Sequence, residues 1–278
     1  MPIPSRPDHG VTSIAVIDRL DQPTIDDLSE RYREVRATTE RLATPLSAED
    51  QVVQSMPDVS PTKWHRAHVT WFFETFLLAP NLPGYEADPI FGYLFNSYYE
   101  AVGARHPRPE RGLLTRPSID EIAAYRCKVD EAMDRLLAGP LRSDAEIRGL
   151  VELGLHHEQQ HQELLLMDIK HLLSRNPLLP AYRTADGPGL AGQAAAELGF
   201  VGFDEGLREV GHAGSGFAYD NEQPRHRAFL EPYEIASRPV TNGEFLEFIQ
   251  DGGYRRPDLW LADGWTTVQR EGWKRPFY

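Results

Sequence analysis

The sequence predicts an α+β protein in which a four-helix bundle precedes a smaller, incomplete mixed α/β domain. Three observations support this fold class. Helical periodicity dominates the first 174 residues, a stretch rich in Pro, Gly and Ala follows, and short apolar runs separated by turn residues fill the remainder. We therefore place the bundle at residues 1–174, a linker at 175–196 and the second domain at 197–278.

The first helix begins after Pro23, where apolar residues recur at spacings of three, four and seven as far as Leu42. The second helix is expected to begin with Ser60 as its N-cap and Pro61 at the first helical position. It runs to about Ala79, where prolines end it.

A long connection, residues 81–117, separates the second helix from the third. Connections of this length are uncommon in compact domains and are often functional. The third helix begins at a capping box formed by Ser118 and Glu121, and Gly139 ends it.

The fourth helix is the longest of the predicted helices. It is expected to begin at a second capping box, formed by Ser143 and Glu146, and to reach about Ser174. Four helices, two of them joined by a long crossover, are typical of a four-helix bundle.

Beyond the linker, the runs FVGF, LREVGH and RAFLEPYEIA are separated by Gly, Asn and Pro, which predicts strands and turns. Thr241 and Glu244 form a further capping box at the start of the short helix NGEFLEFIQ, which Gly252 and Gly253 close.

The composition is that of a folded protein with an excess of negative charge. There are 42 acidic and 29 basic residues, for a formal net charge of −13. This balance argues against binding to nucleic acid or to an anionic membrane and favours a small polar substrate. The single cysteine, Cys127, excludes an internal disulfide. With no secretion signal and no membrane-spanning run, we expect a cytoplasmic protein.

The strongest chemical signal is the segment from His157 to His161, HEQQH, on the longest helix. Two histidines four residues apart lie on one helix face, so both can reach one metal ion. A third ligand is expected from the second helix, which carries His65 and His68, because facing helices of a bundle build metal sites. The spacing leaves open which of them binds, whether the metal is Fe(II), Zn(II) or copper, and whether the pair arises by chance.

The same segment matches the zinc-protease pattern H-E-x-x-H, with Glu158 as general base. The extended pattern requires a third histidine where Met167 stands, and no glutamate between Glu163 and Glu197 can act as a downstream ligand. This alternative is therefore disfavoured.

Three other polar residues of this helix are interpreted as structural. His156 points away from the apolar stripe, and His171 lies in the last turns, where a cation suits the helix dipole. Asp168 lies on the same stripe as His161, and we favour a partly buried acid there over a hydrogen-bond partner of a ligand ring.

Several long segments carry a family resemblance. In the first domain these are SPTKWHRAHVTWFFETFLL, FNSYYEAVGARHPRPERGLL and GLHHEQQHQELLLMDIKHLL. They resemble the DinB-like domain of ergothioneine-biosynthesis sulfoxide synthases. In the second domain, YDNEQPRH and RPVTNGEFLEFI are similar to the start of a formylglycine-generating-enzyme-like, or sulfatase-modifying-factor, domain.

The resemblance implies a non-haem iron oxidoreductase. Such enzymes use Fe(II) and O2 to join a thiol sulfur to C2 of the imidazole of hercynine (trimethylhistidine), leaving a sulfoxide. The family's iron-binding histidines correspond to His68, His157 and His161, which makes His65 a neighbour and not a ligand.

The thiol substrate implied by the resemblance is cysteine or γ-glutamylcysteine, and the sequence does not choose between them. Arginines of the long connection are candidates to bind its carboxylate, because a guanidinium can donate two parallel hydrogen bonds. Among them we select Arg108 and Arg111 over Arg105; the competing interpretation is a solvated basic loop.

In the family, the second domain continues beyond the point that corresponds to Tyr278. That further part carries most of the hercynine pocket and the tyrosine that acts as catalytic acid, so we assign no catalytic residue here. The expected remainder would be supplied by another chain or be absent. A related ovothiol or selenoneine synthase, a metal-binding DinB-like thiol transferase and an inactive fragment therefore stay open as alternatives.

Overall fold

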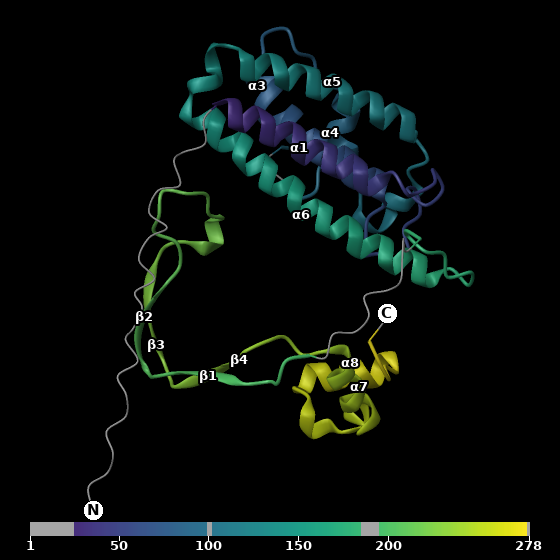
Figure 1. The fold of residues 1–278 in the computed structure, drawn as a ribbon. Coiled ribbons are helices and arrows are strands. Elements are labelled where there is room, and N and C mark those ends of the chain that lie inside the picture. The colour runs from purple at the N-terminus through teal and green to yellow at the C-terminus, as the bar shows by residue number, and fades with distance from the viewer. Residues whose placement is uncertain (1–24, 99–101, 185–194, 277–278) are drawn as a thin grey trace, which may run out of the picture. The chain divides into compact units, whose positions relative to one another are not determined.

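A computed structural model describes residues 25–98, 102–184 and 195–276 (Figure 1). These residues form two compact units, one reaching to Tyr182 and the other beginning at Arg183, with Ser215–Phe217 grouped with the first. Part of the predicted linker, residues 185–194, lies outside the described residues, as do Pro23 and Tyr278. Among the described helices, none combines the length and the apolar character needed to cross a bilayer.

Four long helices build the first unit (Figure 1). They are α1 (Ile25–Ala43), α2 (Thr62–Phe73), α5 (Ile119–Ala138) and α6 (Ala145–Arg175). Helix α1 packs against α5 and α6, and α2 packs against the same two helices. Together with the sheets of the second unit, this bundle confirms the predicted α+β class.

The core lies between these four helices. It contains residues from each of them: Leu28, Tyr32, Phe72, Phe73, Val129, Met133, Val151 and Leu155. A second cluster, Trp64, Trp71, Phe95 and Ile122, covers the side of α2 that faces the long connection. The apolar stripes expected from the sequence thus meet in one interior.

Helix α2 is the central element, because all of its residues are buried. A helix buried on every side is ordinarily apolar, whereas this one carries Lys63, His65, Arg66 and His68. Each buried charge needs a partner. Arg66, for example, donates to Glu40 Oε2 at 2.6 Å and to Gln51 Oε1 at 3.0 Å.

The helix continues past Phe73 through a π-helical segment, η1 (Glu74–Leu78), into α3 (Ala79–Asn81). The predicted N-cap of α2, Ser60, is wrong. The N-cap is Pro61, which has no capping side chain. Ser60 is engaged elsewhere, since its N–H donates to Asp168 and its hydroxyl accepts from Arg111.

The long connection is more ordered than its composition suggests. It contains α4 (Pro89–Phe95) and the 3-10 helix η2 (Arg108–Leu113). After it, Ser118 and Glu121 make the predicted capping box of α5, and Gly139 is the C-cap.

The predicted capping box of α6 is wrong. Ser143 ends a short 3-10 helix, η3 (Pro140–Ser143), and Asp144 is the N-cap. Its carboxylate accepts from the N–H groups of Glu146 at 2.9 Å and Ile147 at 3.1 Å. The aspartate satisfies two helix-end donors, which leaves the preceding serine no capping role.

The second unit has two small antiparallel sheets, which pair β1 with β4 and β2 with β3. The strands are β1 (Phe200–Phe203), β2 (Gly206–Val210), β3 (His226–Leu230) and β4 (Tyr233–Ala236). Helices α7 (Asn242–Gln250) and α8 (Ala262–Glu271) follow. Thr241 and Glu244 make the predicted capping box of α7.

Candidate metal centre

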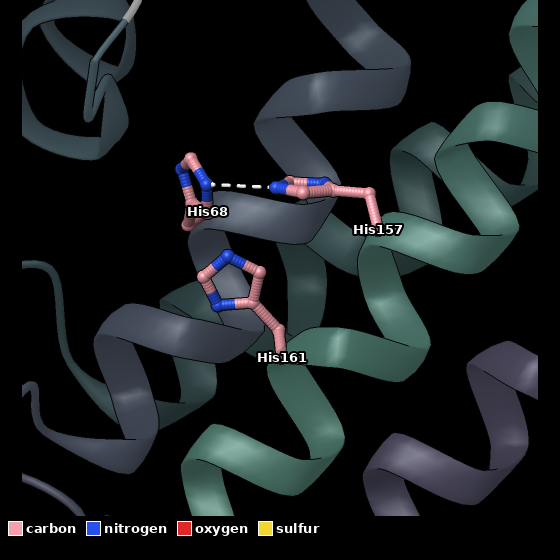
Figure 2. A group of neighbouring side chains, drawn as sticks. All are labelled: His68, His157 and His161. Atoms are coloured by element: carbon pink, nitrogen blue, oxygen red, sulfur yellow. Dashed lines mark hydrogen bonds between the residues drawn. The ribbon is translucent and has the colours of Figure 1, made fainter. Parts of the chain in front are cut away.

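Three histidines from α2 and α6 face one another in the first unit (Figure 2). His68 projects from α2, and His157 and His161 project from successive turns of α6. One ring nitrogen of each lies within 4.8 Å of the other two. The structure therefore brings together the three histidines selected from the resemblance.

A glycine lets the two helices approach closely enough for this. A Cβ atom at Gly154, one turn before His157, would lie 2.6 Å from Phe73 Cε1 and 2.9 Å from Phe72 Cε1. Any larger residue would push α2 and α6 apart.

The ring of His68 is held from several sides. Its Nδ1 is hydrogen-bonded to the carbonyl oxygen of Phe95, and the ring stacks on Trp64 with centroids 4.6 Å apart and planes inclined by 12°. Because a carbonyl oxygen only accepts hydrogen bonds, Nδ1 carries the proton. Nε2 of His68 is left with its lone pair, pointing towards Nε2 of His157 at 3.2 Å.

The three imidazoles are neutral near pH 7. Burial lowers the pKa of His157 to about 4. Burial, reinforced by the neighbouring imidazoles, holds the pKa values of His68 and His161 well below their usual value. Neutral imidazole is the form that binds metal ions.

His157 supplies a test of whether this donor set fits a metal. Its Nδ1 is buried and has no hydrogen-bond partner among the described residues. Its other ring nitrogen, Nε2, lies 3.2 Å from Nε2 of His68, an atom that accepts but does not donate. Three neutral imidazole nitrogens within 4.8 Å of one another fit a divalent ion such as Fe(II), Zn(II) or Cu(II).

His65 lies beside the three histidines but has both ring nitrogens engaged. Nε2 is 2.9 Å from Asp168 Oδ2, and Nδ1 is 2.9 Å from Nδ1 of His161. Asp168 is partly buried, as expected, and it bonds the neighbour of a candidate ligand and not a candidate ligand itself. The seven-residue spacing indicated that Asp168 and His161 lie on one face of the helix. It did not indicate that the ring of His65 lies between them.

Glu158, the general base of the disfavoured protease pattern, is fully buried in a different network. Its carboxylate accepts from Arg36 at 3.0 Å, Thr39 at 2.6 Å and Arg126 at 3.2 Å. Burial would raise the pKa of Glu158, but the Arg36 and Arg126 charges outweigh it, so the pKa lies below its usual value. A carboxylate held by two guanidinium groups does not serve as a base at the metal centre.

The two arginines selected from the connection differ in position. Arg108 is exposed, with hydrogen bonds to the Tyr98 hydroxyl and the Asp58 carbonyl. Arg111 is only 4% exposed and donates to Ser60 Oγ at 2.9 Å and Ser97 Oγ at 3.3 Å.

The guanidinium of Arg111 is connected to the histidines through the ring of Trp64. Its Cζ is 3.4 Å from the ring centroid of Trp64, which in turn stacks on His68. Burial, aided by the charge of Arg108, lowers the pKa of Arg111 to about 9. Its Nε is buried and has no hydrogen-bond partner in the described part of the chain. Arg111 therefore retains a donor for an anionic group close to the centre.

Comparison with known proteins identifies both units. Residues 31–165 match the DinB superfamily, and residues 192–277 match the sulfatase-modifying factor enzyme 1-like domain. The two matched regions fall in the first and second units, respectively, and together they cover most of the chain. The resemblance drawn from the sequence motifs is thereby confirmed.

Three curated relatives share this similarity, and each is named hercynine oxygenase. The protein of Mycolicibacterium thermoresistibile is 33% identical over 227 residues, which is 79% of this chain and 47% of the relative. That of Mycobacterium tuberculosis is 31% identical over 90% of this chain and 57% of the relative. The protein of Mycolicibacterium smegmatis is 32% identical over 80% of this chain and 50% of the relative. The chain spans about half the length of these relatives.

Proposed function

We propose that the first unit holds the iron centre of an oxygen-dependent sulfoxide synthase, which joins a cysteine-type thiol to hercynine in ergothioneine biosynthesis. His68, His157 and His161 would bind Fe(II). The observation that carries the proposal is the convergence of three neutral imidazoles within 4.8 Å. The name shared by the relatives, hercynine oxygenase, supplies the substrate class.

The proposed reaction is balanced with O2 as the only oxidant. The thiol loses its S–H hydrogen, C2 of the hercynine imidazole loses its C–H hydrogen, and a C–S bond forms between them. One oxygen atom becomes the sulfoxide oxygen and the other leaves as water with both hydrogens. The C–S bond and the S–O bond each release two electrons, which together reduce O2. Bound Fe(II) would supply the redox chemistry and a site for the thiolate sulfur.

Arg111 is proposed to hold the carboxylate of the thiol substrate. It contacts Trp64, which stacks on His68, it is fixed by two serine hydroxyls, and its Nε remains able to donate. The exposed Arg108 would attract the same carboxylate from further out. A charge fixed by its neighbours orients a substrate at low entropic cost.

The test is anaerobic loading of the chain with Fe(II), followed by addition of O2, hercynine and either cysteine or γ-glutamylcysteine. Oxygen uptake that requires both substrates, with the sulfoxide detected by mass spectrometry, is the expected result once the part of the family's second domain that carries the hercynine pocket is supplied in trans. Binding of the thiol is followed separately, through the absorption spectrum of the Co(II)-loaded chain, because a thiolate on cobalt gives a distinct charge-transfer band.

A zinc-loaded chain that transfers a thiol without O2 would contradict the proposal and support the thiol-transferase alternative. A selenium donor or histidine used in place of these substrates would instead assign the chain to a selenoneine or ovothiol synthase.

A further inference from the structure

We propose that His65 and Asp168 are positioning residues, which hold the proton of His161 on Nδ1 and so present Nε2 of His161 to the metal ion. The inference rests on the proposed metal centre. It concerns two residues that do not themselves bind the metal.

A continuous chain of hydrogen bonds carries the inference. Asp168 Oδ2 lies 2.8 Å from the backbone nitrogen of Ser60 and 2.9 Å from Nε2 of His65. Nδ1 of His65 lies 2.9 Å from Nδ1 of His161. His65 is buried, with 3% of its surface exposed, so solvent does not compete for these contacts.

The direction of each hydrogen bond follows from the atoms present. A carboxylate oxygen accepts hydrogen bonds, and Asp168 Oδ2 accepts one from the N–H of Ser60 and one from His65. The proton of His65 therefore lies on Nε2. A neutral imidazole carries one N–H group, so Nδ1 of His65 is an acceptor. Nδ1 of His161 must then donate to it, which leaves Nε2 of His161 with a free lone pair.

The partly buried carboxylate of Asp168 also affects how strongly His161 can bind a metal ion. Negative charge on Asp168 polarises His65, and through it His161, which makes Nε2 of His161 a better electron donor. The N–H of Ser60 anchors the carboxylate from the residue just before the N-cap of α2. The two helices that carry the centre are therefore linked by the same chain of bonds.

The other two candidate ligands act as internal controls. His68 has its proton held on Nδ1 independently, by the carbonyl oxygen of Phe95. His157 has no described partner at Nδ1. Loss of the His65–Asp168 chain should therefore alter the tautomer of His161 alone.

The first experiment measures the tautomer of each histidine in the full metal-free chain. Long-range proton–nitrogen NMR spectra of the 15N-histidine-labelled protein distinguish Nδ1–H from Nε2–H, and single histidine variants assign the signals. In the wild type we expect Nδ1–H at His161. In His65→Leu we expect a mixture of tautomers at His161, with the His68 signals unchanged.

A conservative variant separates positioning from packing. In His65→Asn, the side-chain oxygen can occupy the position of Nδ1 and accept from His161. We expect this variant to keep Nδ1–H at His161, although its link to Asp168 is broken. Asp168→Asn tests the charge, since the amide oxygen can still accept from Ser60 and His65.

The second experiment measures Co(II) and Zn(II) affinity by competition with a chelator, with melting curves recorded for each folded variant. Loss of an outer partner of a metal-binding histidine typically weakens metal binding by about 10- to 100-fold. We expect a loss in this range for His65→Leu and a smaller one for His65→Asn and Asp168→Asn.

Nε2–H at His161 in the wild type would overturn the inference. Unchanged metal affinity in folded His65→Leu would do the same, and complete loss of metal in His65→Asn would make His65 a ligand instead. Failure of the wild type to take up any metal would contradict the proposed function, while the tautomer measurement on the metal-free chain would still decide this inference.

Discussion

Nε2 of His68 lies 3.2 Å from Nε2 of His157, although 89 residues separate them in the sequence. The two rings come from α2 and α6, and both are neutral because burial lowers their pKa values. Because the proton of His68 lies on Nδ1, this contact is a hydrogen bond when His157 carries its proton on Nε2. A divalent ion bound by both would replace that hydrogen bond with two coordinate bonds.

Removal of any one candidate ligand is expected to abolish tight iron binding. We predict that His68→Ala, His157→Ala and His161→Ala each lower bound iron from about one equivalent per chain to a small fraction. Metal content after anaerobic reconstitution and desalting checks this. His156→Ala, on the same helix but outside the cluster, is the matched control and should retain its iron. Full occupancy in His68→Ala would show that His68 is not a ligand.

The close approach of α2 and α6 depends on Gly154. Gly154→Ala is predicted to destabilise the protein by about 1–3 kcal/mol, because the new methyl group collides with Phe72 and Phe73. It should also weaken metal binding, since His157 lies one turn further on. Gly149→Ala is the control. Gly149 lies on the same helix, a Cβ atom there would meet no neighbouring group within 4 Å, and the substitution should stabilise the protein by about 0.5–1 kcal/mol. Urea unfolding of both variants decides the point.

Glu158 is predicted to be a structural and not a catalytic carboxylate. Glu158→Gln leaves Arg36 and Arg126 without their buried counter-charge, so we expect a loss of about 3–5 kcal/mol in unfolding free energy. Glu163→Gln, exposed on the same helix, should change stability little. If Glu158→Gln kept its stability and lost a hydrolytic activity, the protease pattern would be correct after all.

The pH dependence of the unfolding free energy should differ between the wild type and Glu158→Gln. The folded-state pKa of Glu158 lies below its ordinary value of 4.5, so the unfolded chain binds the proton more readily. The contribution of Glu158 is therefore fully present above pH 4.5 and is lost as the pH falls through the folded-state pKa. We expect the stability gap between wild type and Glu158→Gln to narrow below pH 4.5. Equilibrium unfolding across an acid pH series checks this, and a gap that widens would contradict it.

Arg111 is predicted to set the affinity for the carboxylate of the thiol. Arg111→Lys keeps the charge but loses the fork that bonds Ser60 and Ser97, so cysteine should bind about 10-fold more weakly or worse. Titration of the Co(II)-loaded chain measures this. Cysteamine, a thiol without a carboxylate, is the control ligand and should bind both proteins equally. Equal weakening for both thiols would point to a packing defect.

The sequence by itself determined the features that depend on residues close together in the chain. Capping boxes at Ser118 and Thr241 were predicted correctly because cap and partner are three residues apart. The shared face of His157 and His161 follows in the same way from helical geometry. At Ser143 the local pattern was misleading, because Asp144 stands next to it and caps α6 with a charged group.

Only the tertiary structure decided what depends on packing between distant elements. Spacing could not choose between His65 and His68, since both lie on a helix that is buried on every side. The packing of α6 and α4 distinguishes them: His68 faces His157, whereas both nitrogens of His65 are engaged by Asp168 and His161. Likewise, Arg108 is exposed and Arg111 is buried, and burial is set by which elements cover each side chain. These partners are far apart in sequence, so no local pattern records them.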